Sequence, residues 1–194
     1  MTLMDVTVKY FESPGDHAIE VFDHSKPVID ERGITNVIVA STRGETGALA
    51  CESFDPQKYN LVIVAHSQGF LAKNEQEFLD ENKNIIAGKG GKILIGTHAF
   101  SGVETGLSKK LAPSNIIFPV EQFARLVRLT IGDGVKVCME IATMAADAGL
   151  VPVDVDALCI AGTGKGADTA CIIKPAYSRD FTELRIKQIL CKPE

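Results

Sequence analysis

Short apolar runs alternate with polar, glycine-containing segments along most of the chain. Each run is rich in Val, Ile, Leu or Ala and ends at Gly, Ser, His or Pro, a pattern typical of strands covered on both faces. The stretch Leu184–Cys191 alternates in polarity instead, which predicts either an edge strand or a short helix. The continuous runs predict strands at Val6–Phe11, Val37–Ser41, Leu61–Ala65, Ile93–Gly96, Ala157–Ala161 and Cys171–Lys174.

Segments with helical spacing lie between these runs. Val120–Ile131 is the clearest, because its apolar residues recur at intervals of three and four. Asp16–Glu31 also has apolar residues at helical spacing, but Pro27 should kink or split that helix. Further helices are expected at Gly44–Phe54, Asn74–Ala87 and Val135–Gly149.

The segment Val135–Gly149 is mostly apolar and carries one polar stripe. Glu140 and Asp147 are expected on the solvated side of this helix, and a subunit interface or a cofactor contact for Glu140 is the alternative. The stripe consists of Lys136, Glu140, Thr143 and Asp147.

The order of these elements predicts a single α/β domain over residues 1–194. Alternating strands and helices favour a three-layer α/β/α arrangement around a mostly parallel sheet. Residues 162–169 join the last two strands of continuous apolar sequence and are too few for a crossover helix. We therefore expect an antiparallel C-terminal hairpin that closes one edge of the sheet.

Composition narrows the class of protein. The 194 residues are 45% hydrophobic and 23% charged, as in ordinary globular domains. The 20 basic and 25 acidic residues give a net charge of −5, so there is no general attraction for nucleic acid or an anionic membrane. With neither a spanning apolar run nor a secretory signal, we expect a soluble cytoplasmic protein, and a homo-oligomer is compatible with the sequence.

The five cysteines are odd in number and widely spaced, and no C-x-x-C motif occurs. This pattern argues against both a disulfide framework and a cysteine zinc site. No pair of histidines has metal-binding spacing either, so we expect no metal.

Polar, glycine-containing loops follow four of the predicted strands. Because ligands in open α/β sheets bind beyond the carboxyl ends of the strands, these loops are expected to converge on one binding edge. The loops are 41-STRGETG-47, 66-HSQG-69, 97-THAFSG-102 and 162-GTGKGADT-169.

The loop 41–47 has the composition of an anion site between a strand and a helix. Its glycines let the backbone approach a ligand, its hydroxyls can hydrogen-bond, its arginine can contact two phosphate oxygens, and the helix N-terminus favours negative charge. An ordinary loop with a Ser or Thr cap is equally compatible. The candidate ligand-binding residues are Ser41, Thr42, Arg43, Gly44, Thr46 and Gly47.

The loop 162–169 places glycines around a single lysine. It matches neither G-x-G-x-x-G nor G-x-x-x-x-G-K-[ST], so neither a dinucleotide fold nor a phosphate-loop nucleotidase is indicated. A backbone-rich nest for an anion is one interpretation and a glycine-rich hairpin turn is the other. The candidate residues are Gly162, Thr163, Gly164, Lys165, Gly166, Asp168 and Thr169.

The segment Ala65–Gly69 resembles the nucleophile turn of a serine hydrolase, with Ser67 as the nucleophile. A triad would then need an acid followed by a histidine. The only later histidine is His98, and the acids between the two lie in a predicted helix, which disfavours this interpretation. His66 and His98 instead end two strands, where they either tie down loops or contact a ligand.

Two longer segments carry a family resemblance. The run 134-GVKVCMEIATMAADAGLVPVDVDALCIAGTGKGADTACIIKPA-176 resembles the end of the C-terminal α/β domain of pyruvate kinase, and 36-NVIVASTRGETGALA-50 resembles that domain's first strand and loop. The chain as a whole is similar to a family of small stand-alone proteins with this domain. The resemblance implies the same fold and a regulatory or ligand-binding role. It implies no pyruvate kinase activity, since the catalytic barrel has no counterpart in these 194 residues.

The resemblance also implies candidate ligands. In pyruvate kinases the two matched loops bind a phosphorylated sugar effector, and the stand-alone family is associated with flavin mononucleotide (FMN) and has no defined reaction. Three hypotheses follow: an FMN-binding protein, flavin-dependent if it is an enzyme; a sugar-phosphate sensor without chemistry; and, least favoured, a hydrolase using Ser67. In the first, the residues lining a slot for the flavin ring would be His66, Ser67, His98 and Ser101.

Overall fold

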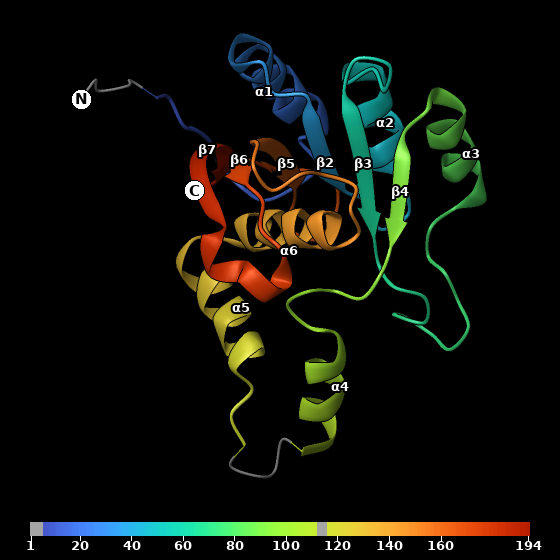
Figure 1. The fold of residues 1–194 in the computed structure, drawn as a ribbon, viewed down its shortest axis with the longest axis vertical. Coiled ribbons are helices and arrows are strands. Elements are labelled where there is room, and N and C mark those ends of the chain that lie inside the picture. The colour runs from blue at the N-terminus through green and yellow to red at the C-terminus, as the bar shows by residue number, and fades with distance from the viewer. Residues whose placement is uncertain (1–5, 112–115) are drawn as a thin grey trace.

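A computed structural model of the chain describes residues 6–111 and 116–194. Seven strands form one sheet in the order β1-β7-β6-β5-β2-β3-β4 (Figure 1). The strands are β1 (Lys9–Phe11), β2 (Asn36–Ala40), β3 (Asn60–Ala65), β4 (Lys92–Ile95), β5 (Ala157–Ala161), β6 (Thr169–Lys174) and β7 (Arg185–Pro193).

Most neighbouring strands are parallel. β5, β2, β3 and β4 run in one direction, and β6 is antiparallel to both β5 and β7. The expected antiparallel pairing of the C-terminal strands is therefore confirmed. Its expected position is wrong, because β7 and β1 extend the sheet beyond β6 and the hairpin lies inside the sheet. The segment Leu184–Cys191 was expected as an edge strand or a short helix, and most of it forms the strand β7. β7 lies between β1 and β6, so it is not at the edge.

Helices cover both faces of the sheet, which confirms the three-layer architecture. Along β2, Val37 and Val39 pack into one hydrophobic cluster, whereas Ile38 packs into the other. The first cluster lies under α1 (Ala18–Arg32), α2 (Glu45–Ser53) and α3 (Asp80–Lys89), and the second lies under α5 (Pro119–Thr130) and α6 (Asp133–Asp147). Apolar side chains pointing to both faces explain the continuous apolar strand sequences.

Pro27 does not split α1, which is continuous from Ala18 to Arg32. A proline removes the hydrogen bond to the carbonyl four residues earlier, here that of Asp23. Both Pro27 and Asp23 lie on the exposed face of the helix, where water can satisfy that carbonyl. The expected split is therefore wrong.

The helix expected at Asn74–Ala87 begins later, at Asp80. Tertiary contacts hold the preceding residues in a loop: the Leu79 N–H donates to the Arg43 carbonyl, and Phe78 is buried. Two elements were not expected, namely α4 (Gly102–Leu111) and the 3-10 helix η1 (Ser178–Glu183).

The helix α4 extends away from the sheet, and α5 lies beside it below α6 (Figure 1). α4 has no buried residue, and Val103 and Leu107 are exposed on it. Within the described part of the chain, no helix has the length and apolar character needed to cross a membrane.

Candidate functional site

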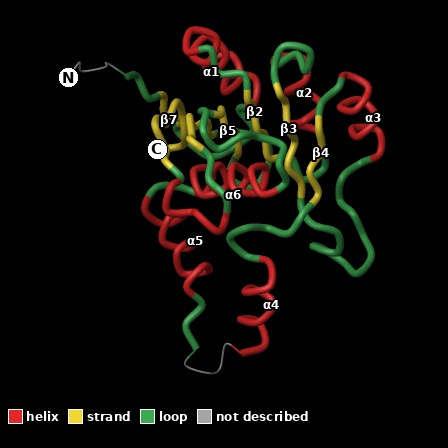
Figure 2. Tube along the Cα trace, in the orientation of Figure 1, coloured by secondary structure: helices red, strands yellow, loops and turns green. Residues whose placement is uncertain are grey.

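The carboxyl ends of four parallel strands meet at one edge of the sheet. In the register, Ala40 pairs with Val64, Val39 with Ile160 and Ala65 with Ile95, so β2, β3, β4 and β5 end at nearly the same level. Figure 2 shows the loops that follow β3 and β4 leaving the sheet together at this edge. The expected convergence of the four polar loops is therefore confirmed, and a cleft of about 1540 Å³ lies there.

Many of the residues expected at a ligand site line this cleft. Five do not: Gly44, Gly47, Thr163, Asp168 and Thr169. Those that line it are Ser41, Thr42, Arg43, Thr46, His66, Ser67, His98, Ser101, Gly162, Gly164, Lys165 and Gly166.

The loop 41–47 is fixed by its packing against α3. Gly44 has a φ of 91°, and a Cβ there would lie 2.6 Å from the Cβ of Asn82, so this glycine serves backbone geometry and close packing. The Asn82 side-chain amide donates to the Arg43 carbonyl at 3.0 Å, and Ser41 Oγ accepts the Gly47 N–H at 3.2 Å. These contacts hold the loop in place, while the Arg43 guanidinium reaches solvent and pairs with Glu45 at 3.4 Å.

The loop 162–169 is closed internally by a buried carboxylate. Asp168 accepts the Thr163 N–H at 3.0 Å and the Thr169 hydroxyl at 2.7 Å, and its side chain has no exposure to solvent. Asp168 and Thr169 therefore shape the turn from inside. Lys165 is exposed and lines the cleft.

His66 stands at the centre of a short hydrogen-bonded chain. Its Nδ1 lies 2.9 Å from Glu77 Oε2, and its Nε2 lies 3.4 Å from Thr42 Oγ1. Glu77 was expected inside a helix, but it lies in the loop before α3 and lines the cleft. Separation in sequence hid this contact, because the three residues come from two different loops.

Three rings form an aromatic cluster beside that chain. The Phe70 ring centroid lies 4.1 Å from that of His66 and 5.0 Å from that of His98, and the Phe70 and His98 rings are nearly parallel, at 24°. All three residues line the cleft. Phe70 is 53% exposed, so a large apolar face is open to a ligand. No motif in the sequence indicated a role for Phe70.

The α6 helix contributes a buried ion pair to the wall of the cleft. Lys136 Nζ lies 2.5 Å from Glu140 Oε2, and Glu140 Oε1 accepts the Phe100 N–H at 2.8 Å. Burial lowers the pKa of Lys136, and the carboxylate of Glu140 opposes that effect. The expectation that Glu140 faces solvent is wrong, because Glu140 is buried and the loop at Phe100 contacts it; Lys136 and Thr143 of the same stripe are buried too.

His98 lies between the ion pair and His66. Burial lowers the pKa of His98 below its usual value, and the nearby carboxylate of Glu140 opposes the shift. The centroid of its ring lies 5.0 Å from that of His66. The neutral form of His98 is therefore favoured near neutral pH.

Further cations line the cleft from helices outside the predicted loops. Lys109 on α4 and Arg125 on α5 are exposed at its rim, and Arg128 pairs with Asp133 at 3.1 Å. The amphipathic pattern of residues 120–131 indicated the helix, but it did not indicate which of its polar residues face a site.

Across the described residues, no group of three or more His, Cys, Asp or Glu side chains is arranged to hold a metal ion.

Ser67 lines the cleft but has no catalytic partner. Among the described residues it makes no hydrogen bond to a histidine side chain, and its carbonyl accepts the Phe70 N–H at 3.2 Å. The hydrolase hypothesis for Ser67 therefore lacks the base that a triad requires.

No family model matches the chain.

Proposed function

We propose that the cleft binds a flat, phosphorylated ligand and that FMN is its best candidate. The observation that carries the proposal is the juxtaposition, in one cleft, of the His66–Phe70–His98 ring cluster with glycine loops that carry exposed cations. A flavin ring offers a flat face for stacking, and its phosphate offers an anion for the loops.

The phosphate is assigned to the loops that follow β2 and β5. Arg43 and Lys165 are exposed on these loops and line the cleft, so each can add a charge-assisted hydrogen bond to a phosphate oxygen. The N-terminus of α2 adds backbone N–H groups and a favourable dipole. Together these groups offset the overall charge of −5 where the ligand would sit.

The ring is assigned to the side of the cleft near Phe70. His66, Ser67, His98 and Ser101 supply polar atoms around that aromatic face, as the polar nitrogens and carbonyls of a flavin require. FMN would supply hydride and electron transfer. The residues of this chain would orient the ring, and His66 or His98 would exchange a proton with it. We do not propose pyruvate kinase activity for this chain.

A sugar-phosphate sensor without catalysis is the second candidate. The same cationic loops favour it, and so does the resemblance to the effector-binding domain of pyruvate kinase. A sugar phosphate needs only small polar contacts, however, and leaves the exposed ring of Phe70 without a role. The aromatic cluster therefore favours FMN over a sugar phosphate.

The first test is the visible absorption spectrum of the purified protein, followed by equilibrium dialysis against FMN. We expect a flavin spectrum and saturable binding of one FMN per chain. Phe70→Ala should weaken that binding by about tenfold or more, the value of a lost aromatic contact. Leu71→Ala is the matched control, because Leu71 is 74% exposed and does not line the cleft. Equal affinities for the two variants would remove the aromatic cluster from the site.

A further inference from the structure

The hydrogen-bonded chain through His66 has a geometry that binding alone does not require. Glu77 Oε2 lies 2.9 Å from one ring nitrogen of His66, and Thr42 Oγ1 lies 3.4 Å from the other. His66 and Glu77 are 30% and 21% exposed, so the pair is partly shielded and still reaches the cleft. An acid, an imidazole and a hydroxyl in this order are the components of a nucleophilic triad.

We propose that Thr42, His66 and Glu77 form an acyl-transfer site in which Thr42 Oγ1 is the nucleophile for a small carboxylic ester. This inference does not depend on the flavin, because it rests on hydrogen bonds among three side chains, of which only His66 also belongs to the ring cluster. It also differs from the Ser67 hypothesis, since the geometry places Thr42 and not Ser67 at the imidazole.

The roles follow from what each group can donate. The carboxylate of Glu77 only accepts hydrogen bonds, so it holds the proton of His66 on Nδ1. The lone pair of Nε2 then faces the Thr42 hydroxyl and can take its proton. The 3.4 Å separation is longer than a tight hydrogen bond, as is common before substrate binds. Glu77 is a positioning residue, because it acts through His66.

Candidate donors for the developing negative charge follow Thr42 in the same stretch of chain. The helix α2 begins at Glu45, and the N–H groups of Glu45 and Thr46 have no acceptor among the described residues. Free N–H groups at a helix N-terminus stabilise an oxyanion through hydrogen bonds and the helix dipole. The nucleophile and these donors therefore share one short segment of chain.

The reaction balances without any further reactant than water. Thr42 Oγ1 bonds to the ester carbonyl carbon as its proton passes to His66 Nε2. The bond from that carbon to the leaving oxygen then breaks, and the leaving oxygen takes the proton from His66, which frees the alcohol. Water, with His66 again as the base, attacks the acyl-threonine, releases the carboxylic acid and restores the Thr42 hydroxyl.

The test uses 4-nitrophenyl acetate with the full chain freed of any flavin. Wild type should release a burst of nitrophenolate and gain the mass of one acetyl group, which peptide mapping should place on Thr42. Thr42→Val and His66→Gln should each lower the acylation rate by about a hundredfold or more, the usual value of a positioned base. Thr130→Val is the matched control, since Thr130 is exposed on α5 and lies outside the cleft.

Two further variants separate a catalytic role from a structural one. Thr42→Ser keeps a hydroxyl and should still be acetylated at position 42, which decides the question even where Thr42→Val does not fold. Glu77→Ala should slow acylation, and the ¹⁵N spectrum of His66 should show the proton moving away from Nδ1. A merely structural role for Glu77 would leave that tautomer unchanged.

Three results would each overturn the proposal. These are the absence of any acetylation in wild type, an acetyl group mapped to Ser67 or another residue, and a folded Thr42→Val variant that is acetylated as fast as wild type. Since no flavin is present in these assays, each result leaves the FMN proposal standing.

Discussion

Lys136 and Glu140 lie one turn apart on α6, and their charged groups meet at 2.5 Å with side chains only 4% and 5% exposed. Removing one member of such a pair leaves the other charged and buried, which typically costs about 3–5 kcal/mol. We expect Lys136→Met to lower the free energy of unfolding by about that amount. Burial lowers the pKa of Lys136, which shows that desolvation of its charge opposes the attraction to Glu140. The intact pair therefore adds much less to the free energy of unfolding than is lost when one member is removed.

The double variant Lys136→Met/Glu140→Met is the control for this prediction. Replacing both charges with apolar groups of similar length should restore most of the stability, within about 2 kcal/mol of wild type. Urea unfolding of the two variants measures the difference. A double variant no more stable than Lys136→Met would show that Glu140 matters mainly through its hydrogen bond to the Phe100 N–H, which methionine cannot accept.

The pH dependence of stability should report His98. Its pKa is lowered in the folded protein, chiefly by burial, so the folded state binds fewer protons than the unfolded chain. The stability that depends on neutral His98 is fully present above the pKa of histidine in the unfolded chain, about 6.5. That stability is lost as the pH falls through the lower pKa of His98 in the folded protein. Between pH 7 and pH 5, wild type should therefore lose more stability than His98→Gln. Parallel losses in the two proteins would contradict this.

The cysteines should be unreactive in the native protein. All five are buried and free. Burial raises the pKa of Cys51, raises that of Cys191 to about 12 and raises those of Cys138 and Cys159 well above the usual range, so the thiolate form is scarce. We expect Ellman's reagent at pH 8 to label native protein very slowly and to label all five thiols in guanidinium chloride. Fast labelling of native protein would require an opening that exposes the core.

Arg43 should contribute to ligand affinity and little to stability. Its side chain is 58% exposed and its ion pair with Glu45 is also exposed, so the unfolding temperature of Arg43→Ala should match wild type. Loss of a charge-assisted hydrogen bond to phosphate should weaken FMN binding by about 1.5–3 kcal/mol. Calorimetric titration measures this, and equal affinities would remove Arg43 from the site.

The strands and the common edge at which their carboxyl ends meet could be predicted because each depends on local pattern. Continuous apolar runs such as Val37–Ser41 and Leu61–Ala65 mark strands buried on both faces, and a polar loop directly after each marks the carboxyl end. The position of the hairpin could not be predicted in this way. It depends on β7, whose alternating sequence was compatible with a helix as well as a strand.

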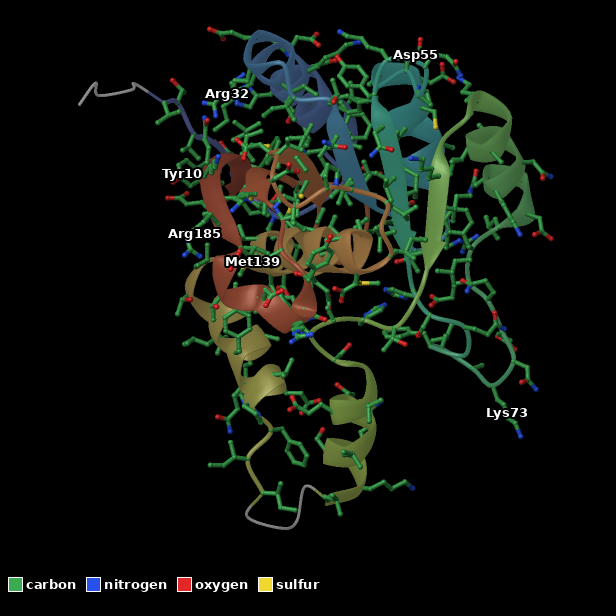
Figure 3. All side chains as sticks on the ribbon, in the orientation of Figure 1. Tyr10, Arg32, Asp55, Lys73, Met139 and Arg185 are labelled. Carbon is green, nitrogen blue, oxygen red and sulfur yellow. The ribbon has the colours of Figure 1, made fainter. Side chains whose placement is uncertain are left out.

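The partners within the site could not be predicted, because they come from distant segments. Glu77 reaches His66 from a loop before α3, which is held in part by the hydrogen bond from the Leu79 N–H to the Arg43 carbonyl. The helical spacing of Glu140 suggested a solvated face, because the sequence does not show that the turn at Phe100 contacts this part of α6. Phe70 belongs to no motif, and only the structure places its ring against those of the two histidines. Lys73, three residues later in the same loop, points outward (Figure 3).

FMN binding in this cleft is tested most directly by a calorimetric titration of flavin-free protein with FMN, riboflavin and a sugar bisphosphate in parallel. FMN should bind most tightly, because it alone offers both a ring for the Phe70 cluster and a phosphate for the loops at Arg43 and Lys165. Riboflavin should bind more weakly by a few kcal/mol, since two or three charge-assisted hydrogen bonds are lost. Tight binding of the sugar bisphosphate, with no FMN binding at tens of micromolar, would rule out FMN as the ligand and favour the sugar-phosphate sensor.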